Sequence, residues 1–187
     1  VTATGVSNYA NKNVGTNKQY TVNNIQLAGQ DNGNYTVITN FSDNNGAITP
    51  KTVSLAVAPK VYDASTDMTG YVSITTGVGG ETLTYNGATS NDAHVATAGK
   101  YLNAITLGNA SDGSGGLASN YQLPTLNAAN APISITPKTV SLAVAPKVYE
   151  ESTDMTGYDS LSTGDVGETV TYNGATSNDA HVATAGK

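Results

Sequence analysis

The amino-acid sequence predicts an all-β fold made of tandem modules of about 87 residues. The composition, the apolar pattern and an internal repeat support this prediction. Charged residues make up only 12% of the chain, which is rich in Thr, Ser, Asn and Gly and contains eleven Tyr. Short apolar segments that alternate with polar residues and end at Gly, Asn, Asp or Pro are typical of strands joined by tight turns. We therefore expect each module to be a small β-sandwich or a β-grasp-like fold.

The repeat is visible in the sequence itself. The segment ITPKTVSLAVAPKVY occupies residues 48–62 and occurs again, unchanged, at residues 135–149. Residues 138–187 align with residues 51–100 without a gap, and 42 of these 50 pairs are identical. Residues 1–50 resemble the second part of the repeat more distantly. Self-similarity at one fixed spacing is typical of arrays of small repeated domains.

The alignment predicts the domain organisation. Residues 1–50 would be the C-terminal part of a repeat, residues 51–137 a complete repeat, and residues 138–187 the N-terminal part of a further one. A permuted phase, cut near Gly87, would instead give two nearly complete modules. The proline after each Ile-Thr strand favours boundaries at 50/51 and 137/138, because proline cannot donate a hydrogen bond to a β-ladder.

The expected elements of the complete repeat are mostly strands. In residues 52–58 apolar residues alternate with polar or small ones, which places them on one face of a sheet, and Pro59 ends this strand. One helical turn is expected at residues 65–70, where Ser65 could begin it. The remaining expected strands, separated by Gly, Asn and Asp, are residues 81–85, 100–107, 120–123 and 132–135.

Two further features of the repeat are interpreted structurally. The copies differ most where YVSITTGVGG at residues 71–80 faces YDSLSTGDVG at residues 158–167. Variation of this kind predicts a surface loop. Tyr101 and Tyr121 are interpreted as residues at the rim of the core, with hydroxyl groups that reach backbone or water.

The composition argues against several classes of partner. The net charge is −6, the isoelectric point is about 4.6, and all eight basic residues are lysines. Nucleic acid and anionic membranes are therefore poor partners. The chain has no Cys, so a disulfide scaffold and a thiol nucleophile are excluded. We expect no membrane insertion, because no apolar run approaches the ~18 residues of a transmembrane helix, and we recognise no signal peptide.

Candidate catalytic residues are few. His94 and His181 occupy the same position of the repeat, and we interpret them as partly exposed histidines at a strand edge. The glycine-rich residues 77–82 lack the lysine and helix of a phosphate-binding loop. Glu150 and Glu151 adjoin in one copy only, which favours a solvated surface. No Gly-x-Ser-x-Gly motif occurs. We therefore predict no enzyme and no catalytic, cofactor-binding or metal site.

Calcium is the one cofactor that the residue types suggest. Asp63, Asp67 and Glu81 could supply oxygen ligands, as could residues 31–34 or Asp112. None of these segments is a complete calcium-binding loop, and Asp and Asn are common turn residues. We therefore predict no bound cofactor.

Two covalent modifications are compatible with the residues present. The three Asn-x-Ser/Thr sequons begin at Asn34, Asn40 and Asn109, and we attribute them to the Asn- and Thr-rich composition. A Lys–Asn isopeptide bond could involve Lys51 or Lys60 if either lysine lay near an Asn and a Glu in the core. The sequence does not decide this.

Four motifs in a fixed order carry a family resemblance: Lys60-Val61-Tyr62-Asp63, NVGTNKQYTVNNIQLAG at residues 13–29, DNGNYTV at 31–37 and AITPK at 47–51. Together they resemble the YDG-type repeats, relatives of the MBG repeats. These repeats occur in very large secreted bacterial adhesins of the filamentous-haemagglutinin kind, which use two-partner secretion. The family glycine after Tyr-Asp is replaced by Ala64, and the second copy reads Tyr149-Glu150-Glu151.

The resemblance implies an extracellular β module that is repeated in tandem along a stalk at the bacterial cell surface. Its partners would be the neighbouring repeats of the same chain, and its role would support cell adhesion or biofilm formation. Two alternatives stay open. The repeats could bind a glycan, mucin or host protein multivalently. They could also self-associate through exposed strands, with residues 138–187 of one chain completing residues 1–50 of another.

Overall fold

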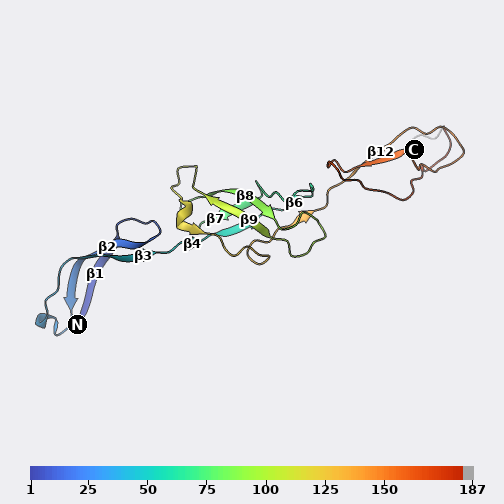
Figure 1. The fold of residues 1–187 in the computed structure, drawn as a ribbon. Coiled ribbons are helices and arrows are strands. Elements are labelled where there is room, and N and C mark those ends of the chain that lie inside the picture. Colours follow the sequence, from blue (N-terminus) through green and yellow to red (C-terminus); the bar gives the residue numbers. More distant parts are fainter. Residues whose placement is uncertain (183–187) are drawn as a thin grey trace.

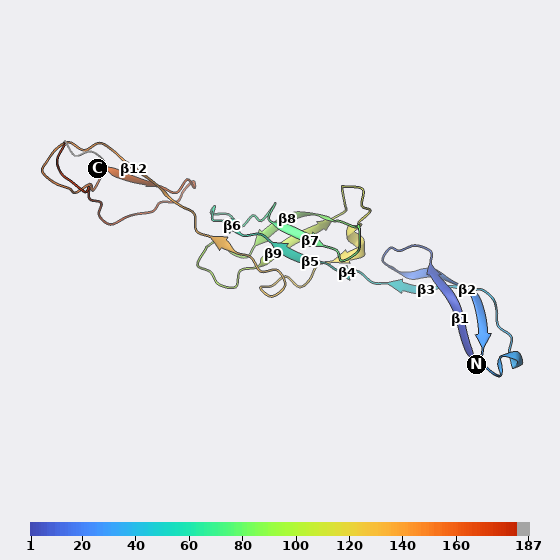
Figure 2. The ribbon, with the colours of Figure 1, turned by 180° about the vertical axis from the view of Figure 1, so that it is seen from behind.

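The computed structural model describes residues 1–182. The chain is elongated, with three groups of strands in line and the two ends of the chain at opposite extremes (Figures 1 and 2). We call these groups the N-terminal unit (residues 1–50), the central unit (51–137) and the C-terminal unit (138–182). The helical elements of the described residues are two 3-10 turns, η1 (Asn32–Asn34) and η2 (Ala118–Asn120). The predicted all-β fold is confirmed.

The N-terminal unit is a single antiparallel sheet. Its strands are β1 (Thr2–Tyr9), β2 (Gly15–Ala28) and β3 (Phe41–Ile48), in the order β1-β2-β3. Thr2 lies opposite Ala28, and a bulge follows Thr4. Every residue of β1 is exposed. Since a sheet needs a second layer to bury one of its faces, this unit lacks a cover.

The central unit contains two antiparallel strand pairs and two short parallel ladders. β5 pairs with β7 and β8 pairs with β9, both antiparallel, while β4 runs parallel to β10 and β6 parallel to β11. The two parallel ladders join the first residues of the unit to its last ones. The bounds are β4 (Lys51–Thr52), β5 (Ser54–Val57), β6 (Lys60–Val61), β7 (Val72–Thr75), β8 (Thr84–Ser90), β9 (Leu102–Gly108), β10 (Tyr121–Gln122) and β11 (Ile135–Thr136).

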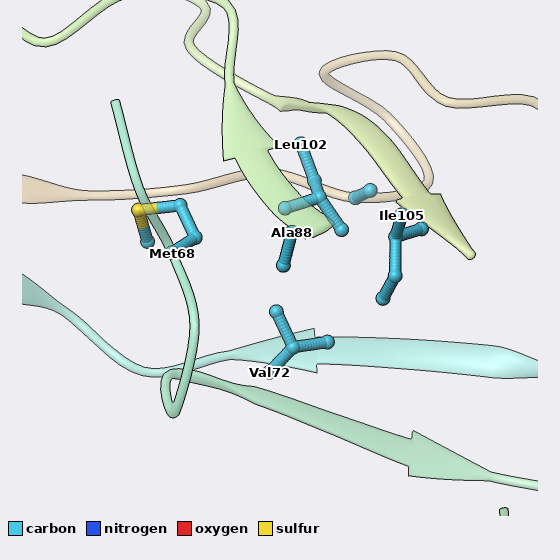
Figure 3. Close-up of a cluster of buried hydrophobic side chains, with 6 residues drawn as sticks. Met68, Val72, Ala88, Leu102 and Ile105 are labelled. Carbon is cyan, nitrogen blue, oxygen red and sulfur yellow. The ribbon is translucent and has the colours of Figure 1, made fainter. Parts of the chain in front are cut away.

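The core of the central unit lies between its two antiparallel pairs. Met68, Ala88 and Leu102 are 0% exposed. Figure 3 shows Val72 facing Ala88 and Ile105 from the opposite layer. Ala131 completes this cluster of buried apolar side chains. Apolar side chains from two facing layers make this unit a small sandwich.

The C-terminal unit repeats only part of this arrangement. β12 (Ser141–Val144) pairs with β13 (Asp159–Ser162), as β5 pairs with β7. The Met155 amide donates to the Ala175 carbonyl oxygen at 2.7 Å, which copies the hydrogen bond from Met68 to Ala88. In the described part of this unit, the copy of β8 at residues 171–177 forms an isolated bridge at Thr176 but no strand. In the central unit β9 supports this position.

Two expectations for the first part of the repeat are wrong. Residues 65–70 form no helix; Asp67 bridges to Thr89, and Thr69 and Gly70 lie in a turn closed by the hydrogen bond from the Tyr71 amide to the Met68 carbonyl oxygen. The variable residues 71–80 are not a surface loop throughout, because Val72–Thr75 is strand β7 and Val72 is 8% exposed. The second copy therefore places Asp159 at a position that is part of the core in the central unit.

The other expected strands are found in shifted or shortened form. The strand expected at residues 52–58 is split into β4 and β5 around buried Val53. The strand expected at 81–85 begins only at Thr84 and continues to Ser90. The domain boundaries at 50/51 and 137/138 stay a prediction. Within residues 1–182, no helix has the length and apolar character that crossing a bilayer requires.

Candidate functional site

A buried lysine organises the Lys-x-Tyr-Asp loop of the central unit. Lys60 begins β6 and is 2% exposed. Its Nζ donates to the carbonyl oxygens of Ser65, at 3.0 Å, and Asp67, at 2.7 Å. It also forms an ion pair with Asp63 Oδ1 at 2.7 Å. All three ammonium protons thus have an acceptor, and the loop from residue 63 to residue 67 is wrapped around one charged group.

The acidic residues of this loop are held in their charged form. Partial desolvation raises the pKa of Asp63, but the hydrogen bonds from Lys60 and the Ser65 amide outweigh it, so this pKa lies below its usual value. Hydrogen bonds from the Thr69 hydroxyl and amide lower the pKa of Asp67. Both carboxylates therefore accept hydrogen bonds that stabilise the loop, although the sequence suggested them as calcium ligands.

The second copy closes its loop in the same way. Lys147 donates to the carbonyl oxygens of Ser152 and Asp154 and pairs with Glu150. Its Nζ also lies 5.6 Å from the centre of the Tyr158 ring, a cation–π arrangement. The change from Asp63 to Glu150 keeps the carboxylate, which explains why the loop tolerates this difference between the copies.

The position after the Tyr-Asp pair has a left-handed backbone. Ala64 has φ of 60°, and Glu151, its copy, has φ of 55°. Side chains with a Cβ atom are strained in this region, whereas glycine is not. This explains why a glycine is expected here in YDG-type repeats, and it shows that both copies keep the backbone geometry without the glycine.

We expect Ala64→Gly to stabilise the central unit by about 1 kcal/mol, because relief of the left-handed strain exceeds the added entropy of the unfolded chain. The midpoint of urea unfolding measures this gain. Ala58→Gly is the matched control, because Ala58 does not have a positive φ. The control should lose about 0.5–1 kcal/mol, and a loss in both variants would contradict the strain argument.

A second buried lysine closes the loop that carries His94. Lys100 is 7% exposed and donates to the carbonyl oxygens of Val95, at 2.9 Å, and Thr97. The His94 side chain is 75% exposed, and its Nδ1 lies 3.0 Å from Asp92 Oδ1. His94 therefore lies in a loop rather than at a strand edge. The His181 side chain is likewise 78% exposed, and its Nδ1 lies 2.8 Å from Asp179 Oδ1.

The first contact between units centres on Glu81. The Lys12 ammonium of the N-terminal unit donates to Glu81 Oε1, and the Tyr121 hydroxyl donates to Oε2 at 2.7 Å. These two hydrogen bonds, Lys12 first, lower the pKa of Glu81. Beside this pair, the Val14 amide donates to Asn120 Oδ1 at 2.9 Å. Tyr121 is 7% exposed. Its hydroxyl donates to a carboxylate, whereas the sequence predicts backbone or water as its partner.

The second contact between units uses the same glutamate of the repeat. Glu168 is the copy of Glu81, and its Oε1 accepts a hydrogen bond from the Tyr62 hydroxyl of the central unit. This hydrogen bond raises the pKa of Tyr62. The donor is Lys12 at the first contact and Tyr62 at the second, but at both contacts a side chain of the preceding unit donates to this carboxylate. We call Glu81 and Glu168 the junction glutamates.

The remaining candidate residues lie apart from one another. Asp112 Oδ2 accepts a hydrogen bond from the Thr82 hydroxyl at 2.7 Å, and Oδ1 accepts from the Ser114 amide at 3.0 Å. Asp31 precedes η1, and Lys51 begins β4. Among residues 1–182, no three His, Cys, Asp or Glu side chains gather closely enough to hold a metal ion.

Asp112 is expected to titrate at a pH of about 2, because hydrogen bonds from Thr82 and Ser114 favour its charged form. Its contribution to loop stability is therefore complete above its ordinary pKa of 3.8 and is lost as the pH falls through about 2. Carboxyl carbon NMR measures this pKa. Thr82→Val should raise it, whereas Thr84→Val should not, since the Thr84 hydroxyl donates to the Asn109 carbonyl instead.

Residues 1–44 match the family model of the YDG domain. This match supports the YDG-type resemblance, and it falls on the N-terminal unit. The matched YDG segment includes Lys12 and Val14, which form the first contact with the central unit. No curated protein and no solved structure matches the chain.

Sequence reasoning missed the two features that give the site its structure. It treated Lys60 as part of the Lys-x-Tyr-Asp motif and as one partner of a conceivable isopeptide bond, and Glu81 only as a conceivable calcium ligand. The signal for Lys60 was available, because the lysine and the residues around it are repeated at Lys147, and the five residues before Lys60 are all apolar. No sequence pattern points to the partner of Glu81, since Lys12 lies 69 residues away in another unit.

Proposed function

We propose that this chain is part of the extracellular stalk of a bacterial surface adhesin. Residues 51–137 would be one complete module of a tandem array, and the array would hold a distal tip away from the cell in support of adhesion or biofilm formation. The observation that carries the proposal is the end-to-end arrangement of the three units (Figures 1 and 2). The YDG match of residues 1–44 is consistent with it.

Physical reasoning supports a spacer role. An array in which each unit touches only its neighbours gains length in proportion to the number of copies, and each copy brings its own core. Hydrogen bonds at the junction glutamates restrict rotation between successive units. Such a role needs reach and fixed joints, and it requires neither a cofactor nor a catalytic group. The protein would be secreted and would act at the bacterial surface.

The alternative that the repeats themselves bind glycans receives less support from the central unit. Stacking on a sugar requires exposed aromatic rings. The five tyrosines of the central unit are half-buried or buried, whereas the exposed tyrosines lie in the two other units. The exposed ones are Tyr9, Tyr35 and Tyr149.

An array of glycans, mucins and matrix proteins tests the proposal directly. The 187-residue protein would be applied at rising concentration, with and without calcium. A stalk segment is expected to give no saturable binding under either condition. Reproducible saturable binding to one ligand class would replace the spacer with a binding module, and replacement of Tyr35 and Tyr149 would then locate the site.

The stiffness of the first joint depends on Glu81. Glu81→Gln removes the charge that attracts Lys12 but keeps an acceptor for the Tyr121 hydroxyl. Because Lys12 is 70% exposed, we expect less than about 1 kcal/mol of lost stability. The N-terminal unit should nevertheless tumble more independently in ¹⁵N relaxation. Glu151→Gln is the matched control, since Glu151 lies outside both junctions, and equal relaxation in both variants would contradict this role.

A further inference from the structure

An ion pair at the start of the C-terminal unit differs from the other lysine ion pairs of the chain. Lys138 Nζ lies 2.7 Å from Asp165 Oδ1, and the two side chains are 31% and 12% exposed. In the ion pairs of Lys12, Lys60 and Lys147, by contrast, one partner is at least 48% exposed. Among the lysine ion pairs in the described part of the chain, this is therefore the one in which neither side chain is exposed.

The Asp165 carboxylate has a second oxygen that is not satisfied. Its Oδ2 is buried and accepts no hydrogen bond from the described residues, and a buried acceptor without a donor is unfavourable. Lys138 donates to Asp165 alone among these residues, whereas Lys60 also donates to two carbonyl oxygens that retain its protons. Because burial disfavours both charges, it favours proton transfer from the Lys138 ammonium to the carboxylate.

The backbone holds the two groups together. Lys138 precedes β12 and Asp165 follows β13, so both residues lie beside the same end of this antiparallel pair. The lysine side chain passes over Gly164, where a Cβ atom would lie 3.5 Å from Nζ. The Asp165 amide donates to the Thr163 hydroxyl at 3.1 Å, which fixes the loop after β13. The approach of Nζ to the carboxylate is thus set by the strand pair and by this loop.

The first copy of the repeat has the lysine but not the carboxylate. Lys51 lies over Gly77 in the same manner, and a Cβ atom on this glycine would lie 3.1 Å from the lysine Cε. The position of Asp165, however, is occupied by Val78. The chain therefore contains its own comparison, with one repeat in which the lysine meets a carboxyl group and one in which it meets none.

We propose that Lys138 and Asp165 are joined by an isopeptide bond. After proton transfer within the pair, the neutral Lys138 amine attacks Cγ of Asp165. A bond forms between Nζ and Cγ, and the bond from Cγ to one carboxyl oxygen breaks. This oxygen leaves as water with two of the three ammonium protons, and the third stays on the amide nitrogen. The bond differs from the one that the sequence suggests, which joins Lys51 or Lys60 to an asparagine.

The reaction needs nothing besides the two side chains. One positive and one negative charge disappear together, so the net charge is unchanged, and no oxidant, reductant or activated group takes part. Well-oriented groups within one molecule react with effective concentrations of about 10⁵–10⁸ M, which offsets the abundance of water that opposes condensation. The product also removes the charge from the buried oxygen that lacks a donor.

The bond closes the C-terminal unit at the point where the central unit joins it. Asp165 lies in the same loop as the junction glutamate Glu168, whose Oε1 accepts from the Tyr62 hydroxyl. In the proposed stalk, a pull from the central unit enters at Lys138, and the amide passes it to this loop without opening the hydrogen bonds between β12 and β13. This role rests on the proposed function, but the bond itself does not.

Intact mass spectrometry of the 187-residue chain under denaturing conditions tests the proposal. The measured mass is expected to be lower than the sequence mass by one water molecule. Lys138→Arg keeps the positive charge and Asp165→Val introduces the residue of the first copy, and each variant should show its full sequence mass. Lys51→Arg is the matched control and should keep the deficit.

Fragmentation of a proteolytic digest locates the deficit. A branched peptide that joins Lys138 to Asp165 is expected. The proposal would be overturned by a full sequence mass of the unmodified chain or by a deficit that persists in Lys138→Arg. A deficit located at Asp112, which precedes Gly113 and can lose water by closing to a succinimide, would also overturn it. None of these results depends on ligand binding in the array experiment, so the bond and the stalk proposal can fail separately.

Discussion

A Lys60→Met variant is expected to lose about 3 kcal/mol from the free energy of unfolding of the central unit. Lys60 is 2% exposed, and its ammonium group binds two backbone carbonyl oxygens, those of Ser65 and Asp67. Methionine fills much of the same volume but donates no hydrogen bond. Each carbonyl oxygen left without a donor costs roughly 1–3 kcal/mol. Asp63 adds little, because its side chain is 48% exposed and regains water.

Urea unfolding followed by tyrosine fluorescence measures this loss, since the central unit contains five of the eleven tyrosines. Lys51→Met is the matched control, because Lys51 is exposed and the substitution removes the same charge. Its effect should stay within about 0.5 kcal/mol. If both variants unfolded at the same urea concentration, the three contacts of Lys60 would not support the loop.

The sequence predicts the fold class and the strands that have a clear alternation. β5 lies within its expected range, where Leu55 and Val57 mark one face by a period of two, whereas β9 begins two residues later than expected and ends one residue beyond its expected range. β12 and β13 pair in the register of β5 and β7, as two copies of one repeat should, although β7 and β13 lie in the segment that the sequence predicts to be a surface loop. An alternating pattern is sufficient to predict such a strand, because the strand buries only one of its two faces.

The sequence fails where long-range contacts override local patterns. Residues 65–70 have the composition of a helical turn, but Lys60 binds the carbonyl oxygens of Ser65 and Asp67, and Asp67 bridges to Thr89. Variation at Val72 suggested a surface, because the copy at that position is Asp159. The structure explains this difference: Asp159 faces an open groove and accepts a hydrogen bond from the Tyr172 hydroxyl, whereas Val72 faces the filled core.

The candidate site could be predicted only in outline. The repeated Lys-x-Tyr-acid motif marks the loop that Lys60 closes, yet the motif does not show that the lysine is buried, because lysine is rarely buried without a partner. The role of the junction glutamates is equally difficult to predict, because in the sequence Glu81 and Glu168 look like ordinary turn residues. Their role depends on which unit precedes them, and that is a property of the assembled chain rather than of the repeat.

The largest effect on the core is expected for Leu102→Ala, at about 3 kcal/mol of lost stability. Leu102 is 0% exposed and begins β9, between the two layers of the central unit. Removing a buried leucine side chain loses its transfer free energy and leaves a cavity that the neighbours refill only in part, which costs 2–5 kcal/mol. Leu102→Met conserves volume and should cost less than about 1.5 kcal/mol.

Native-state hydrogen exchange of this variant also tests the predicted boundaries of the central unit. The Val53 amide donates to Gln122, the Lys60 amide to Ser134 and the Leu102 amide to Ala131, so these three amides report on both parallel ladders and on the core. If residues 51–137 fold as one module, Leu102→Ala should lower the protection of all three amides by the same free energy, because one cooperative core supports them. A loss confined to the Leu102 amide would show that the ladders are stable without the core. The boundary at 50/51 would then not mark the start of a cooperatively folding unit, and modules cut near Gly87 would describe the chain better.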